Sequence, residues 1–179
     1  MNMALPEIEK HLKALRLHGM ISTLSTRITQ ANQGDSFVEV FACLVQDELD
    51  SRRSRLIESR LKASGLKERP TMTEFDWSFN PKLPKKEIYE LVSGKFITDG
   101  QDALLIGSPG TGKSHIAKTI AHGAIQTGYK VMYREAHTFF EDLFEASELN
   151  RKKKVNKLFA EADLLVIDDL FLRKKMPEQ

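Results

Sequence analysis

One stretch constrains the fold of this chain more than any other: Gly107-Ser108-Pro109-Gly110-Thr111-Gly112-Lys113-Ser114. It has the Walker A spacing of a phosphate-binding loop, which is a glycine, four residues and then Gly-Lys-Ser. The apolar run Ala103–Ile106 before it predicts a buried strand, and apolar residues at helical spacing follow it. Strand, loop and helix in this order are the context that such a loop needs. The alternative is an ordinary glycine-rich turn that caps a helix.

The residue types in the loop explain how it would bind phosphate. Glycines let backbone N–H groups approach phosphate oxygens without a Cβ in the way. The loop opens a helix, whose N-terminus offers unpaired donors and a partial positive charge. Lys113 can reach the β- and γ-phosphates, and the Ser114 hydroxyl can bind Mg²⁺. The loop therefore predicts a site for a nucleoside triphosphate with its magnesium ion.

A second stretch supports the first. Leu164–Ile167 is an apolar run that predicts a strand buried on both faces, and Asp168 and Asp169 follow it directly. Asp168 would hold Mg²⁺ beside the γ-phosphate, and Asp169 would orient or deprotonate the attacking water. The sequence between Lys113 and Asp168 has room for a helix, a strand and a helix.

Composition sets the outer limits. A chain of 179 residues can hold one ordinary domain, or a small domain and part of a larger one. The net charge of +2 indicates no particular partner, and a single cysteine excludes a disulfide framework. Because no apolar run approaches the length of a membrane span and residues 1–10 do not resemble a signal peptide, we expect a cytoplasmic protein without membrane contact.

The chain divides into three predicted regions. Residues 1–64 predict a small helical domain whose first helix ends at Gly19. Its longest helix starts at a capping box of Ser36 and Glu39, and its core-facing stripe contains Phe37, Phe41, Leu44, Val45 and Leu49. Residues 65–96 predict a linker that docks through its aromatic side chains, and residues 97–179 predict the nucleotide-binding domain.

The end of the long helix is basic, and its charges continue the azimuth of the apolar stripe. We expect this end to contact nucleic-acid phosphate, while a solvated surface is the alternative. The predicted DNA-binding residues are Arg52, Arg53, Arg55, Arg60 and Lys62.

Four segments carry a resemblance to a known family: residues 12–20, 75–81, 107–117 and 164–169. On these residues the chain resembles the IstB-type ATP-binding helper proteins of bacterial insertion sequences, relatives of the DnaC helicase loader within the AAA+ ATPases. The resemblance implies an α/β fold, with a three-layer αβα P-loop core behind the helical domain, and ATP and Mg²⁺ as cofactors. It also implies oligomers on double-stranded DNA, contact with a transposase, and Lys113 and Asp169 as catalytic residues of an ATPase.

The sequence departs from this family at its end. Gln179 lies ten residues after Asp169, whereas AAA+ domains continue with two more strands, a polar sensor residue and an arginine finger. In the family's sheet order, the strands ending at Ile106 and Ile167 would lack the neighbour that joins them. We therefore expect an incomplete parallel sheet in a truncated product with low stability and little ATP hydrolysis. A helicase loader and an inactive fragment are the alternative functions.

Overall fold

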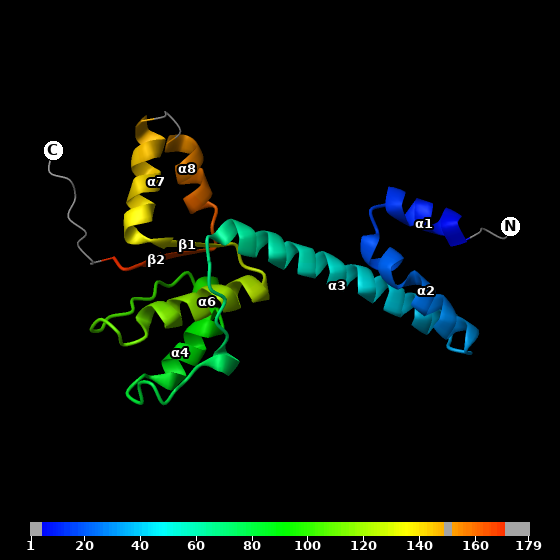
Figure 1. The fold of residues 1–179 in the computed structure, drawn as a ribbon, viewed down its shortest axis with the longest axis horizontal. Coiled ribbons are helices and arrows are strands. Elements are labelled where there is room, and N and C mark those ends of the chain that lie inside the picture. The colour runs from blue at the N-terminus through cyan, green and yellow to red at the C-terminus, as the bar shows by residue number, and fades with distance from the viewer. Residues whose placement is uncertain (1–4, 149–151, 171–179) are drawn as a thin grey trace. The chain divides into compact units, whose positions relative to one another are not determined.

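The structure is a computed structural model that describes residues 5–148 and 152–170. The chain forms two compact units, Met1–Glu58 and Ser59–Gln179. Figure 1 shows the elements along the chain, and one long helix, α3 (Phe37–Ser64), passes from the first unit into the second. None of the helices in the described ranges is long and apolar enough to cross a membrane.

The first unit contains α1 (Leu5–Ala14), α2 (His18–Asn32) and the larger part of α3. The prediction that Gly19 ends the first helix was wrong, since α1 ends at Ala14 and Gly19 lies in the first turn of α2. A Cβ on Gly19 would come within 2.7 Å of the Asp47 carbonyl oxygen and of the Glu48 Cα. The glycine therefore permits close packing of α2 against α3.

The apolar stripe at the start of α3 is exposed, and the prediction of a core-facing side was wrong there. Phe37 is 77% exposed, Phe41 53% and Leu49 55%. The reason is that α2 approaches α3 at Asp47 and Glu48, and it covers those residues instead of the phenylalanines. Phe37 and Phe41 stack on each other, with ring centroids 6.0 Å apart.

The second unit is built on a parallel sheet of β1 (Val131–Glu135) and β2 (Leu164–Asp168), in a register that pairs Val131 with Leu164 and Glu135 with Asp168. Figure 1 shows α7 (Ala136–Glu148) and α8 (Lys152–Ala160) on one side of these strands. On the other side lie α6 (Lys113–Thr127) and α4 (Lys85–Val92). This is the layered α/β arrangement that the sequence predicts, with a small sheet.

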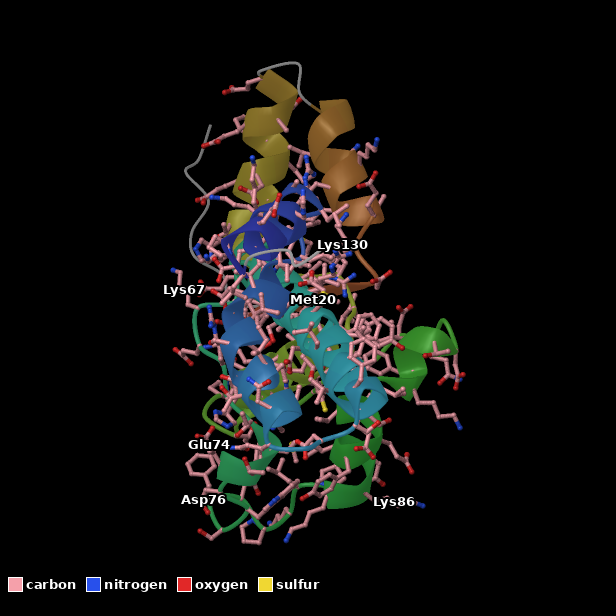
Figure 2. All side chains as sticks on the ribbon, turned by 90° about the vertical axis from the view of Figure 1, so that its right-hand side faces the viewer. Met20, Lys67, Glu74, Asp76, Lys86 and Lys130 are labelled. Atoms are coloured by element: carbon pink, nitrogen blue, oxygen red, sulfur yellow. The ribbon has the colours of Figure 1, made fainter. Side chains whose placement is uncertain are left out.

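Buried apolar side chains join α6 to its neighbours in this unit. Ile88 of α4 packs with Ile116 and Ile120 of α6, and all three are at most 6% exposed. The segment between α3 and α4, which includes the short helix η1 (Met72–Glu74), adds Phe75 and Trp77 to this cluster. Figure 2 labels Lys67, Glu74 and Asp76 of the same segment. A one-turn helix, α5 (Lys95–Thr98), follows α4.

The prediction of a strand at Ala103–Ile106 was wrong. These residues form no regular element in the structure, and Leu104 and Ile106 are 73% and 85% exposed. The physical reason is that a strand needs a neighbour to receive its backbone hydrogen bonds, and the described sheet contains β1 and β2. For the same reason β2 is only partly buried along its length, where the sequence predicts burial on both faces.

Candidate nucleotide site

The loop at residues 107–114 has the backbone conformation that its glycines permit. Gly110 and Gly112 have φ angles of 75° and 92°, a left-handed conformation that other residues rarely adopt. Gly112 is the N-cap of α6, which begins at Lys113. A Cβ on Gly107 would lie 3.2 Å from the Thr111 hydroxyl oxygen, so this position also favours glycine. The sequence thus specifies a tight loop that turns directly into a helix.

The backbone donors of this loop are unpaired. Pro109 has no N–H. Within the described residues, no other backbone N–H from Ser108 to Ser114 donates to a protein acceptor. The cause at the start of α6 is general, because the first N–H groups of a helix have no partner within it. Unpaired amides at a helix N-terminus form a site that attracts an anion.

Lys113 lies back across its own loop. Its ammonium group donates to the carbonyl oxygen of Ser108 at 2.8 Å, and the Thr111 hydroxyl donates to the same oxygen at 2.8 Å. A carbonyl oxygen is a weak partner for an ammonium ion compared with phosphate, because only phosphate carries a full charge. If the Lys113 ammonium group gave up the Ser108 carbonyl oxygen for a phosphate oxygen, Lys113 would bind the phosphates as the sequence predicts.

Asp168 lies next to the start of α6, as the sequence predicts. The Ser114 hydroxyl donates to Oδ1 of Asp168 at 3.1 Å, although the two residues are 54 positions apart. The other carboxylate oxygen, Oδ2, accepts a hydrogen bond of 2.5 Å from the hydroxyl of Tyr133. Both oxygens of Asp168 are thus oriented by hydroxyl groups, one from α6 and one from β1.

Tyr133 is a site residue that the sequence reasoning missed. It lies on β1, where the sheet register pairs it with Val166, two residues before Asp168. Burial raises the pKa of the Tyr133 hydroxyl, and so does its hydrogen bond to the Asp168 carboxylate. The phenol therefore remains a proton donor to Asp168 at any physiological pH. The only signal in the sequence is that Tyr133 belongs to an apolar segment typical of a strand. That strand, β1, pairs with β2, which ends at Asp168.

Asp169 lies at the exposed turn after β2. Its φ of 54° is unusual for a residue other than glycine, and its backbone N–H donates to Oδ1 of Asp168 at 2.9 Å. This bond stabilises the left-handed turn and adds a third donor to the Asp168 carboxylate. The carboxylate of Asp169 is exposed, and its predicted catalytic role stays a prediction.

A cleft of about 1370 Å³ joins these groups. Its lining includes Gly110, Gly112, Lys113 and Ser114 of the loop and of α6, and Asp168 and Asp169 at the end of β2. Its apolar lining includes four side chains from the segments before the loop, which are Phe75, Phe79, Phe96 and Ile97. The cleft therefore combines a donor-rich end with an aromatic region, as a nucleotide requires for its phosphates and its base.

The aromatic segment 75–80 lies directly against the loop. Phe75 contacts the His115 ring with centroids 5.3 Å apart. The Asn80 side-chain amide donates to the Thr111 carbonyl oxygen at 3.5 Å, and a Cβ on Gly112 would lie 4.0 Å from the Phe79 ring. The segment therefore contacts the donor end of the cleft as well as the hydrophobic cluster under it.

A magnesium ion fits the residues at the donor end. Mg²⁺ prefers hard oxygen ligands and commonly takes one or two from the protein and the rest from phosphate and water. Ser114 and Asp168 supply a hydroxyl and a carboxylate oxygen whose separation is 3.1 Å. These two residues are the ones for which the sequence predicts metal contact.

The five predicted DNA-binding residues divide between the two units. Arg52, Arg53 and Arg55 belong to the first unit, and Arg60 and Lys62 to the second. Arg60 lies beside Gly128, the C-cap of α6, where a Cβ would be 3.4 Å from the guanidinium. A cation at a helix C-terminus interacts favourably with the helix dipole, which gives Arg60 a local role.

The loop, the helix behind it and the acid at the end of the adjacent strand define a P-loop nucleotide-binding protein. The family model described as IstB-like ATP binding protein matches residues 10–175, and the chain belongs to this family. It is 30% identical over 96% of its length to an IS21-like insertion-sequence ATP-binding protein of Bacteroides fragilis, of which it covers 80%.

Two further relatives are also named as ATP-binding proteins of insertion sequences. The chain is 27% identical to one from Mycobacterium tuberculosis over 94% of its own length, and 27% identical to one of IS21 in Pseudomonas aeruginosa over 92%. It spans 68% of the first relative and 62% of the second. The similarity thus includes the helical unit as well as the loop.

Proposed function

We propose that this chain binds ATP with Mg²⁺ in the cleft between the 107–114 loop and Asp168. The observation that carries the proposal is the shared cleft itself, because residues of the loop with unpaired amides and Asp168 line the same cavity. Phosphate oxygens would accept from the amides, and Lys113 would exchange the Ser108 carbonyl for a phosphate oxygen. Ser114 and Asp168 would hold the magnesium ion.

The base would lie against the apolar lining of the cleft. Phe96 and Ile97 belong to this lining, and an adenine ring stacks favourably on such side chains. Asp169 would act on the attacking water from the turn after β2. A shorter side chain than glutamate at this position suits slow hydrolysis and a switch that depends on the bound nucleotide.

At the level of the whole protein, we propose a helper of an insertion-sequence transposase. The support is membership of the IstB-like family and the names of the relatives, all of which belong to insertion sequences. The partners in this role would be double-stranded DNA, the transposase and further copies of the chain. Of the basic residues of α3, Arg52 and Arg55 are our candidates for the DNA contact.

Removal of the Lys113 charge tests the nucleotide proposal. Hydrogen bonds to charged groups contribute about 1.5–3 kcal/mol, so we expect Lys113→Ala to weaken ATP binding by roughly ten- to hundredfold. The measurement is calorimetric titration of ATP, with and without Mg²⁺, into the full chain.

Lys118→Ala is the matched control. Lys118 belongs to the same helix, but its ammonium group pairs with Glu68 at 2.9 Å. This variant should bind ATP as the wild type does. Equal affinities for the Lys113→Ala variant and the wild type would contradict the proposal.

A further inference from the structure

Three arginines of the first unit surround one hollow. Arg52 and Arg55 come from α3, and Arg16 comes from the turn between α1 and α2. These three side chains alone line an open hollow of about 320 Å³ within the described residues. Arg16 was not among the residues for which the sequence predicts DNA contact, because it is 36 positions away from Arg52 along the chain.

The backbone holds Arg16 in this place. Its φ of 59° is left-handed, and the turn is closed by hydrogen bonds from its own N–H to Lys13 (3.0 Å) and from Leu17 to Leu12 (2.8 Å). The contact of Gly19 with α3 then brings the turn close to Arg52. The approach of Arg16 is thus a consequence of how α2 packs.

One buried carboxylate organises the two arginines of α3. Glu48 is 4% exposed, and its Oε1 accepts from Nε of Arg52 at 2.6 Å and lies 3.5 Å from a terminal nitrogen of Arg55. Its Oε2 accepts from the backbone N–H groups of Gly19 (2.6 Å) and Met20 (3.3 Å), and Met20 is labelled in Figure 2. Both oxygens of Glu48 are therefore engaged.

The hollow carries excess positive charge. Arg52 and Arg55 share the single carboxylate of Glu48, and within the described residues the side chain of Arg16, which lines the same hollow, has no hydrogen bond or ion pair. Arg52 uses its Nε on Glu48, which leaves both terminal nitrogens as donors. Like charges that converge in this way repel one another, and an anion between them relieves the repulsion.

The geometry favours phosphate as that anion. Guanidinium groups donate two parallel hydrogen bonds to a phosphate, and Arg52 and Arg55 are three residues apart on one face of α3. The hollow is open, and the described residues that line it are all arginines, which suits a phosphate of a long polymer. Arg53 is turned by about 100° from Arg52 around the helix and does not line the hollow.

We propose that Arg16, Arg52 and Arg55 together bind a phosphate of the nucleic-acid backbone, with Glu48 fixing the orientation of the two α3 arginines. This inference rests on the proposed function, because it takes DNA as the partner. It goes further by naming Arg16 as a contact and by setting Arg53 apart.

The test compares four variants of the full chain: Arg16→Ala, Arg55→Ala, Arg53→Ala and Arg16→Lys. Binding of a fluorescent double-stranded oligonucleotide is measured by anisotropy over a salt series. Each phosphate contact that is lost should lower the slope of log affinity against log salt by about one. We expect this change and a roughly three- to tenfold loss of affinity for Arg16→Ala and Arg55→Ala.

Arg53→Ala removes the same charge from the same helix and should keep the wild-type slope. Arg16→Lys keeps the charge without the forked donors, so it should fall between Arg16→Ala and the wild type, and it guards against a folding defect in the alanine variant. Equal slopes for the Arg16→Ala and Arg53→Ala variants would overturn the inference. Tight binding of inorganic phosphate alone, without DNA binding, would overturn the choice of partner.

ATP titration of the same variants separates this inference from the proposed function. All four should bind ATP as the wild type does, because the loop lies in the other unit. If the wild type binds DNA and the Arg16→Ala variant binds it with the same affinity and the same salt slope, the proposed role of the hollow is wrong and the proposed function stands. If the wild type binds ATP but no DNA, the DNA contact of the proposed function fails as well.

Discussion

Two similar apolar runs of this protein differ in structure, since one forms a strand and the other does not. Leu164–Ile167 forms β2, which pairs with β1 over five positions and leads into Asp168. Ala103–Ile106 leads into the phosphate loop but forms no strand, and its Leu104 and Ile106 are exposed. A strand is therefore stabilised by the neighbouring strand with which it exchanges backbone hydrogen bonds. A helix such as α6 makes its own backbone hydrogen bonds, so it forms even though the run before the loop is not a strand.

The largest expected effect comes from removing one side chain from the paired sheet and one from residues 103–106. Met132 of β1 is 2% exposed, and Met132→Ala should lower the free energy of unfolding of the second unit by about 2–5 kcal/mol. Ile106→Ala should change it by no more than about 0.5 kcal/mol, because the side chain is 85% exposed.

Urea unfolding followed by tryptophan fluorescence measures both variants, since Trp77 is the single tryptophan and belongs to the hydrophobic cluster of this unit. Similar losses for Met132→Ala and Ile106→Ala would show that residues 103–106 are packed in solution.

A smaller effect is expected at the start of α2, because a helix also needs hydrogen-bond partners at its ends. Glu48 caps the start of α2 from a position 29 residues away. Its hydrogen bond from Arg52, together with those from Gly19 and Met20, holds the pKa of the Glu48 carboxyl below its usual value of 4.5. The stability that this carboxylate contributes is therefore present above pH 4.5 and lost as the pH falls through the lowered pKa.

Thermal unfolding of the wild type and of the Glu48→Gln variant measures this contribution. We expect a lower Tm for Glu48→Gln at pH 7, with a difference that shrinks as the pH falls below 4.5. Glu39→Gln is the control, since Glu39 is an exposed residue of the same helix. A Tm difference for Glu48→Gln that stays constant down to pH 2 would contradict the role of the charge.

The smallest expected effect concerns the link between β1 and the site. Tyr133→Phe removes one of the two side-chain donors to Asp168. A hydrogen bond contributes about 0.5–1.5 kcal/mol net, so the gain in ATP affinity on adding Mg²⁺ should fall by roughly two- to tenfold. ATP affinity without Mg²⁺ should stay the same.

Tyr129→Phe is the matched control, because its hydroxyl is hydrogen-bonded to Thr98. It should leave both affinities unchanged. A fall in affinity for the Tyr133→Phe variant that does not depend on Mg²⁺ would mean that Tyr133 acts on the fold instead of on Asp168.

The sequence predicts the local parts of this molecule well. The loop, α6, β2 and the long helix α3 follow from spacing, glycines and apolar periodicity over short windows. The proximity of Ser114 to Asp168 also follows, because a parallel strand must end beside the loop.

The contacts that depend on distant residues could not be predicted in this way. The hydrogen bond from Tyr133 to Asp168 depends on the register of two strands, and the role of Gly19 depends on how closely α2 approaches α3. Exposure of Phe37 and of Ile106 has the same origin, since each side chain lacks the neighbour that its apolar character suggests.

In the proposed complex, the unpaired amides of the loop hold the phosphates of ATP. Backbone amide chemical shifts of the ¹⁵N-labelled chain, recorded during titration with Mg·ATP, test it most directly. We predict the largest shifts at Gly110, Gly112, Lys113 and Ser114, with saturation at one equivalent of ATP. Unchanged signals at these four amides, while ATP binds elsewhere or not at all, would contradict the account.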